Sequence, residues 1–288
     1  MSHHAVLSDQ EFLDTRRFLI AAKRLANDLS YGTDPSPYLG SGTEYVQSRP
    51  YQIGDSIRSI DWRVTARTGK PFVKEYKATK ALPCYLLVDT SASMTVSSLP
   101  RSKYGHAVIV AGGLALACLD RVSPVGMIAV GDRDLRIQPS LSRDQILTWL
   151  HQLKKYRFDE ATTLGERITE LTPRLTSRAM VLILSDLHDP GAVGAIRLLA
   201  QNHDVCVLQF RDPAERSMTG TGFVRAREAE TGQTFLTRGK QSLVKQFGLE
   251  QSLKRGGVDH LIIDTDKPYE KNLTRFFGQR SILGRGAR

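Results

Sequence analysis

The strongest constraint on the fold is a series of five short apolar runs after Pro83. They read "CYLLVD", "GMIAVGD", "AMVLILSD", "DVCVLQFRD" and "DHLIIDT", and most are separated by helix-length segments such as residues 103–121 and 192–201. Strands that are apolar on both faces must be buried between layers of helices. The pattern therefore predicts an α/β fold with a doubly wound, mostly parallel sheet.

One segment predicts an exception to the parallel order. The run "RDLRIQPS", residues 133–140, follows "GMIAVGD" after so short a turn that no crossover helix fits between them. We therefore expect it to pair antiparallel as an edge strand. Further along, "GFVRAREAETGQTFLT", residues 222–237, predicts an inserted hairpin, because Thr231 and Gly232 can turn between two alternating runs.

The N-terminal part of the chain has a different pattern of predicted elements. Residues 8–29 predict a helix that opens with a capping-box pattern. Residues 43–79 alternate the β-like runs "TEYVQ" and "PFVKEYKAT" with turn signals, which indicates a small β-rich unit. We therefore predict two parts: residues 1–80 hold the N-terminal helix and the β-rich unit, and residues 81–288 form the main α/β domain.

Composition restricts the class of protein. A chain of 288 residues that is 41% hydrophobic can bury a real core. The formal net charge is +10, but the basic residues are scattered and match no nucleic-acid-binding motif. The longest apolar stretch, residues 107–118, is interrupted by two glycines and is too short to span a membrane. We expect no nucleic-acid partner and no membrane span.

The compartment is predicted from the start of the chain and from its cysteines. The opening "MSHHAVLSDQEF" lacks the basic region and apolar core of a secretory signal. Three cysteines lie in apolar segments without pairing or metal spacing, which suits small core residues in a reducing compartment. We therefore expect a cytoplasmic protein.

The stretch "LLVDTSASM", residues 86–94, is the first candidate for a functional site. Its apolar run stops at Asp89 and continues with Ser91 and Ser93. In open α/β sheets, ligands bind at the carboxyl ends of strands. Side chains at alternate positions of an extended loop point the same way, so these three can converge on one point. Oxygen ligands of this kind suit a hard cation such as Mg²⁺ or Mn²⁺, which would favour a carboxylate from another molecule.

Two further segments are predicted to complete the site. The run "LILSD" ends in Asp186 in the same way, and neighbouring strand ends can flank one crevice. The segment "DEATTLGERI" supplies Thr162 and Thr163 just before a predicted helix, where a hydroxyl can also serve as a cap. Asp and Ser after a strand are also ordinary turn formers, so the metal interpretation depends on all segments together. His188 is a further option, which the preference of hard cations for oxygen disfavours.

Together these segments resemble the metal-ion-dependent adhesion site of von Willebrand factor A domains. The resemblance covers the chain from about Pro83 to its end and includes the D-x-S-x-S pattern, the Thr of "ATTLG" and the later Asp. It implies that Thr162 is the ligand threonine. Relatives often have Gly where this chain has Leu187. The implied metal ligands are Asp89, Ser91, Ser93, Thr162 and Asp186.

The upstream region resembles a second pattern. The stretch "GSGTEYVQSRPYQIGDSIRSIDWRVTAR", residues 40–67, is similar to the signature of the bacterial domain-of-unknown-function-58 family. Members of that family look like partners of MoxR-type AAA+ ATPases. The resemblance implies a chaperone-like adaptor in protein maturation or complex assembly, without enzymatic chemistry of its own.

Arginines and acidic residues alternate in that signature, and two interpretations stay open. A buried ion-pair network would hold this unit against the main domain. A docking face for the ATPase would instead use Trp62 as an aromatic anchor. The candidate partner-binding residues are Arg49, Arg58, Trp62 and Arg67.

An enzyme is the rival class. Asp89 with Mg²⁺ could serve a phosphatase or phosphotransferase as the phosphoryl acceptor. Haloacid-dehalogenase-like phosphatases, however, resemble D-x-D at this point, and here the second acid is replaced by Ser91. No G-x-S-x-G elbow and no phosphate-binding G-x-x-x-x-G-K-[ST] loop occur in the sequence. We therefore predict a non-enzymatic adaptor that presents a divalent cation to an acidic residue of a partner.

Overall fold

The structure is a computed structural model. It describes residues 16–31, 43–52, 55, 60–78, 82–120, 123–131, 135–154, 160–217, 223–227, 234–238 and 248–282. The predicted N-terminal helix is present as α2, Arg16–Tyr31, and its expected first residues, 8–15, lie outside the described residues.

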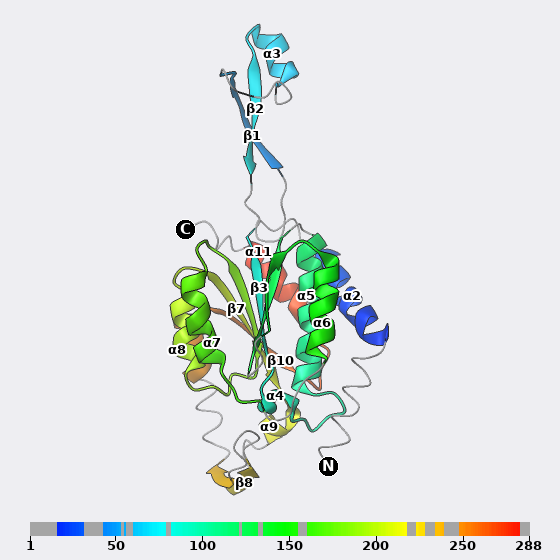
Figure 1. Ribbon diagram of the computed structural model, residues 1–288, viewed down its shortest axis with the longest axis vertical. Helices are drawn as coiled ribbons and strands as arrows, with labels where there is room; N and C mark the ends of the chain where they lie inside the picture. Colours follow the sequence, from blue (N-terminus) through cyan, green and yellow to red (C-terminus); the bar gives the residue numbers. More distant parts are fainter. Residues whose placement is uncertain are drawn as a thin grey trace.

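A central sheet of six strands forms the body, in the order β10-β7-β6-β3-β4-β5 (Figure 1). All neighbouring pairs are parallel except β4 with β5, which is antiparallel at the edge. This confirms the predicted mostly parallel sheet with one reversed edge strand. The strands are β3 (Cys84–Asp89), β4 (Val125–Val130), β5 (Arg136–Ser140), β6 (Met180–Ser185), β7 (Asp204–Arg211) and β10 (Asp259–Asp264).

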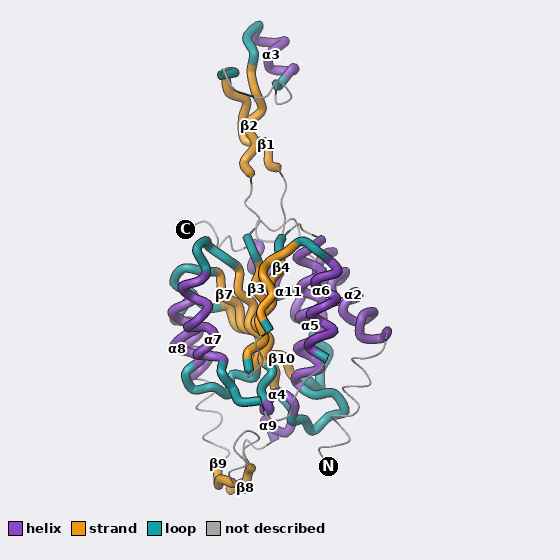
Figure 2. The backbone as a smooth tube through the Cα atoms, in the orientation of Figure 1, coloured by secondary structure: helices purple, strands orange, loops and turns teal. Residues whose placement is uncertain are grey.

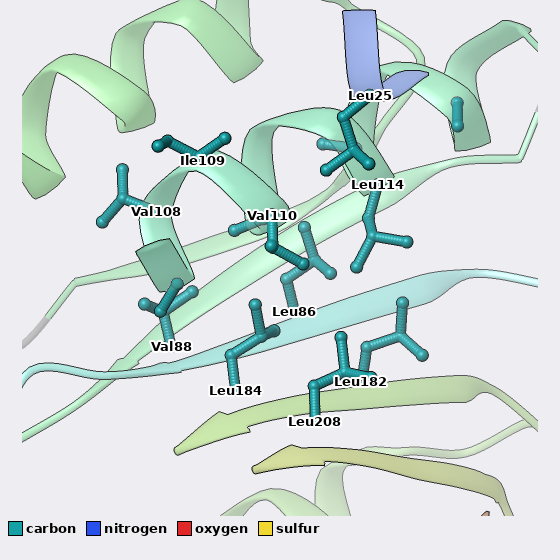
Figure 3. Packing of buried hydrophobic residues seen from close by; sticks show 14 of the residues in the cluster. Leu25, Leu86, Val88, Val108, Ile109, Val110, Leu114, Leu182, Leu184 and Leu208 are labelled. Atoms are coloured by element: carbon teal, nitrogen blue, oxygen red, sulfur yellow. The ribbon is translucent and has the colours of Figure 1, made fainter. Parts of the chain in front are cut away.

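Helices cover both faces of this sheet (Figure 2). Alternate residues of β3 point to opposite faces, so Leu86 packs in one core cluster with Val110 of α5, and Leu87 packs in the other with Ile168 of α7 and Ile196 of α8. Figure 3 shows the first of these clusters. Besides the helical residues 248–255, the helices of the body are α4 (Ala92–Thr95), α5 (Lys103–Asp120), α6 (Arg143–Leu153), α7 (Leu164–Leu171), η2 (Thr172–Arg174), α8 (Ala192–Leu199), α9 (Pro213–Ser217) and α11 (Glu270–Ile282).

The longest helix in the described part of the chain, α5, lies between the sheet and other helices. Every residue from Lys103 to Cys118 is buried, because α2 and α6 pack against the helix on the sides that the sheet leaves open. A Cβ at Gly113 would lie 2.7 Å from Leu25 Cδ2 of α2, so the absent side chain allows the two helices to approach. The apolar stretch 107–118 is thus a core helix. Within the described residues, every helix is too short or too polar to cross a membrane.

The predicted β-rich unit is an antiparallel hairpin that projects from the body. It pairs β1, Thr43–Pro50, with β2, Phe72–Ala78, and Figure 1 shows it at the end of the molecule opposite to α4 and α9. A short helix that we did not predict, α3 (Trp62–Thr68), lies between the strands. It forms because Asp61 caps its first turn and Gly69, with φ 68°, ends it.

The second predicted hairpin is also present. Strand β8, Phe223–Arg227, pairs antiparallel with β9, Thr234–Arg238, and the expected turn between them lies outside the described residues. In Figure 1 this hairpin lies at the same end of the body as α4 and α9.

Candidate metal centre

Two buried carboxylates meet at the carboxyl edge of the sheet. Strand β3 ends at Asp89, and its parallel neighbour β6 ends one residue before Asp186. The two residues are 0% and 2% exposed. Burial, together with the negative charge of Asp186, raises the pKa of Asp89 to about 7. The negative charge of one carboxylate thus disfavours ionisation of the other.

The first candidate segment folds into a tight loop around Asp89. The carboxylate accepts bonds from Ser185 Oγ at 2.5 Å and from the backbone N–H of Ser91 at 3.0 Å. The hydroxyls of Ser91 and Ser93 lie 3.0 Å apart. The structure therefore brings these predicted ligands to one place, but not through the extended loop that we expected, since Ser91 is the N-cap of α4 and Ser93 lies in its first turn.

The segment with the two threonines reaches the same loop through a glutamate. The carboxylate of Glu160 accepts a bond from Thr90 Oγ1 at 2.6 Å, and its backbone carbonyl accepts one from the N–H of Ala92 at 2.8 Å. Glu160 is fully buried, so this connection is part of the core. The hydroxyl of Thr163 donates to the Gly131 carbonyl at 3.2 Å and makes no helix cap, whereas Thr162, the predicted ligand, is half-buried.

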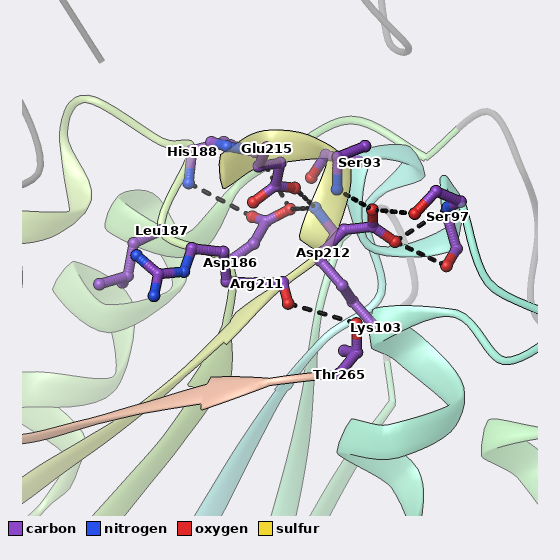
Figure 4. A network of polar contacts seen from close by, with 12 residues as sticks. Ser93, Ser97, Lys103, Asp186, Leu187, His188, Arg211, Asp212, Glu215 and Thr265 are labelled. Carbon is purple, nitrogen blue, oxygen red and sulfur yellow. Dashed lines mark hydrogen bonds and ion pairs between the residues drawn. The ribbon is translucent and has the colours of Figure 1, made fainter. Parts of the chain in front are cut away.

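A lysine that we did not predict lies against the second carboxylate. Figure 4 shows Lys103 between Asp186 and Glu215, and its Nζ lies 2.8 Å from Asp186 Oδ2 and 2.5 Å from Glu215 Oε1. Burial disfavours the charged ammonium, but the two carboxylates outweigh it and raise the pKa of Lys103 above its usual range. A sequence signal existed, since Lys103 is the one lysine, arginine or acidic residue in the largely apolar segment that runs to Cys118.

Asp186 is therefore strongly held in its ionised form. Burial alone would raise its pKa, but the charges of Lys103 and His188 lower it well below the usual range. His188 Nδ1 lies 3.0 Å from Asp186 Oδ2, so the imidazole contacts the carboxylate instead of standing apart as an independent ligand.

The donor set at this edge fits a hard cation that uses hydroxyl oxygens. Neighbouring ligands of an octahedral Mg²⁺ lie about 3 Å apart, which matches the separation of 3.0 Å between the hydroxyls of Ser91 and Ser93. Among the described residues, no group of three or more His, Cys, Asp or Glu side chains could hold a metal ion. Any metal here must therefore depend on the serine and threonine hydroxyls, and it would share Asp186 with Lys103.

Comparison with known proteins identifies the family. A family model described as "Protein of unknown function DUF58" matches residues 47–257. The chain belongs to the DUF58 family. Uncharacterized proteins of Mycobacterium bovis and Mycobacterium tuberculosis are 26% identical to it over 289 residues, which covers 92% of this chain and 88% of theirs. The DUF58 match extends from β1 in the projecting hairpin to the body, so it is not confined to one part of the molecule.

The residue after Asp186 has an unusual backbone in this DUF58 protein. Leu187 has φ 60°, and it is the one described residue other than glycine with a positive φ. This conformation costs an ordinary residue about 1 kcal/mol relative to glycine. The next acid, Asp189, accepts bonds from the N–H groups of Gly165 at 2.7 Å and Gly191 at 2.8 Å, so it fixes the loop to the start of α7.

The candidate partner-binding residues of the hairpin fall into different surroundings. Arg49 makes a two-point ion pair with Asp55 at 2.7 and 2.8 Å, and the bond from Arg49 lowers the pKa of Asp55 to about 2. Arg58 lies outside the described residues. Trp62 is 67% exposed, and Arg67 is exposed in the last turn of α3.

These positions correct the expectation of a buried ion-pair network beside Trp62. The side chains of Arg49 and Asp55 are 34% and 19% exposed, and their pair joins two residues of the projecting unit. Asp61 caps α3 and accepts a bond from Ser48 Oγ at 2.6 Å, also within the unit. Among the described residues of the signature, these bonds therefore stabilise the hairpin unit itself, which stands away from the body in Figure 1.

Proposed function

We propose that this DUF58 protein is a non-enzymatic adaptor that uses a bound Mg²⁺ or Mn²⁺ to hold an acidic residue of a partner. The observation that carries the proposal is the loop at the end of β3, where Asp89 is fully buried and the hydroxyls of Ser91 and Ser93 lie 3.0 Å apart. The proposal includes a body of the von Willebrand factor A type, with its adhesion site at this edge.

In this proposal each residue has a defined task. Asp89 supplies a negative charge that is fixed by Ser185 and by the Ser91 backbone. Ser91, Ser93 and Thr162 supply neutral oxygens, and Asp186 acts directly or through water. When bound, the cation would offer a positive charge to a carboxylate, since neutral hydroxyl ligands leave most of its charge uncompensated.

We further propose a MoxR-type AAA+ ATPase, or a client protein that it acts on, as the partner in the cytoplasm. The family resemblance of the signature residues motivates this choice. Trp62 and Arg67 are the docking residues that we favour, because both are exposed on α3 at the tip of the projecting hairpin. Trp and Arg side chains are both enriched at the centres of protein interfaces.

The test of the metal centre is a calorimetric titration with Mg²⁺ and Mn²⁺. We expect the wild-type chain to bind one equivalent, and Asp89→Asn and Ser93→Ala to lose most of the binding, since each removes one proposed ligand. Asp120→Asn is the matched control, because it removes an exposed carboxylate at the far end of α5. Equal binding by the wild type and Asp89→Asn would remove the proposed site.

The alternative is a Mg²⁺-dependent phosphatase or phosphotransferase with Asp89 as the nucleophile. Its carboxylate is 0% exposed, and each of its two oxygens already accepts a bond. We favour the adaptor, because direct attack on a phosphorus atom would require one of these oxygens to be free. Turnover of p-nitrophenyl phosphate that is present in the wild type and lost in Asp89→Asn would favour the enzyme.

A further inference from the structure

The proposed metal centre also contains a positively charged side chain of the protein. Lys103 is the first residue of α5, its side chain is 2% exposed, and its ammonium bridges Asp186 and Glu215. A buried ammonium costs several kcal/mol unless it is paired. Lys103 therefore stays between these two carboxylates, inside the group of residues to which we assign the metal.

The second partner of Lys103 is held in place by a separate set of bonds. Glu215 lies on α9, and Asp212, just before that helix, accepts bonds from Ser97 Oγ at 2.8 Å and Ser98 Oγ at 2.5 Å. The loop that leads into α5 is thus tied to the start of α9 (Figure 4). The position of Glu215 opposite Lys103 is built into the fold.

The formal charges of these groups suggest what Lys103 does. Three carboxylates, those of Asp89, Asp186 and Glu215, belong to this group, and Lys103 is paired with two of them. His188 is a second basic group at Asp186, but its side chain is 53% exposed, whereas Lys103 places its positive charge in the buried interior of the centre. In a buried site the surrounding salt screens such charges weakly, so the balance affects binding strongly.

We infer that Lys103 is a resident counter-charge that lowers the affinity of this centre for cations. The inference rests on the proposed function and deepens it, since it names the residue that regulates how strongly the site holds its metal. Without Lys103, one more negative charge would remain at the centre. With Glu215 made neutral, one fewer would remain.

The experiment compares the affinities of Mg²⁺ and Tb³⁺ for full-length variants, by calorimetry and terbium luminescence. Lys103→Met should raise the Mg²⁺ affinity by at least about tenfold, since a buried positive charge is removed. The Tb³⁺ affinity should rise more, by about 1.5 times the change in log affinity seen for Mg²⁺, because the Coulomb energy scales with the charge of the ion. Glu215→Gln should shift both affinities in the opposite direction, and Lys103→Arg should keep them near wild type.

Two controls keep the test clear. The series is repeated in a His188→Gln background, because His188 is a second titratable group against Asp186 and its side chain is 53% exposed. Thermal unfolding without metal shows whether Lys103→Met folds. If it does not, Glu215→Gln tests the same charge balance at a residue whose side chain is 31% exposed.

The outcomes separate this inference from the proposed function. Wild-type binding that neither Lys103→Met nor Glu215→Gln alters would overturn the inference and leave the metal centre intact. No binding by any variant would remove the metal centre itself. Binding by Lys103→Met but not by the wild type would mean that the ammonium permanently takes the place of the metal, which contradicts both.

Discussion

His106 illustrates, at the scale of single residues, how burial determines charge in this core. It lies on α5 with its Nδ1 3.2 Å from the Tyr269 hydroxyl, and the two rings meet edge to face at 5.5 Å. Burial, with a smaller effect of the Arg101 charge, lowers the pKa of His106 to about 3. The imidazole is therefore neutral in the folded protein at any pH near neutrality.

This shift predicts a loss of stability in acid. The ordinary pKa is 6.5, so between pH 6.5 and about 3 the unfolded chain binds a proton that the folded protein does not. The contribution of His106 to stability should therefore fall as pH is lowered through 6.5, by on the order of a few kcal/mol in total. Urea unfolding of wild type and His106→Phe at several pH values measures the difference. Parallel pH profiles would contradict the prediction.

Leu187 shows a second effect of a single residue. Its buried side chain stabilises the core, whereas its φ of 60° is unfavourable for any residue other than glycine. Replacement by Ala or by Gly loses the same packing, but only Gly relieves the backbone strain. We expect Leu187→Gly to be more stable than Leu187→Ala by about 1 kcal/mol, the reverse of the usual order. Denaturant midpoints of the two variants decide this, and a more stable Ala variant would show that the strain is negligible.

At the scale of elements, the contact between α2 and α5 depends on a residue without a side chain. A Cβ at Gly113 would lie 2.7 to 3.0 Å from three atoms of Leu25, including its Cβ, so repacking requires the helix to move. Elsewhere in a helix, Gly to Ala stabilises by up to about 1 kcal/mol. The close approach thus reverses the ordinary effect of helix propensity.

We therefore predict that Gly113→Ala destabilises the protein by about 1–3 kcal/mol through overpacking. In a Leu25→Ala background the same substitution should cost less, because that background lacks the two atoms closest to the added Cβ. Gly194→Ala on α8 is the matched control, since a Cβ there meets nothing within 4 Å, and it should stabilise. Equal effects of the two Ala substitutions in unfolding experiments would contradict the packing explanation.

At the scale of the whole molecule, the two candidate interaction sites lie at opposite ends. Figure 1 shows the projecting hairpin with α3 at one end of the body and α4 and α9, next to the candidate metal centre, at the other. Substitutions at sites so far apart act independently on stability. In our proposal, one partner at the hairpin tip therefore leaves the metal centre free to hold a carboxylate of a second protein.

This separation predicts a selective effect of Trp62→Ala. The variant should bind Mg²⁺ as the wild type does and keep its unfolding free energy within about 0.5 kcal/mol, because Trp62 is 67% exposed. Its binding to a purified MoxR-type ATPase should fall at least about tenfold. Leu198→Ala is the control, since this residue is also exposed, at 52%, but lies on α8. Full ATPase binding by Trp62→Ala in a pull-down would exclude the hairpin tip as the docking face.

Local sequence patterns predict most of the strands and helices, and they place Asp89 and Asp186 at the same end of the main sheet. Continuous apolar runs predict buried strands because every side chain in them must leave water, and the helix-length segments between them predict parallel order. Asp89 and Asp186 were predictable for the same local reason, since each polar group follows directly on an apolar run. The unpredicted helix α3 is short, and its cap residues also read as turn signals.

Which charged side chains meet, in contrast, depends on how distant segments pack. Lys103 pairs with Asp186, 83 residues away, and with Glu215, 112 residues away, and Thr90 bonds Glu160 across 70 residues. Spacing along the chain carries no information about such pairs, because strand order brings the segments together and a long side chain can reach several positions. The positive φ of Leu187 is likewise imposed by its surroundings, since a buried leucine does not favour that conformation alone.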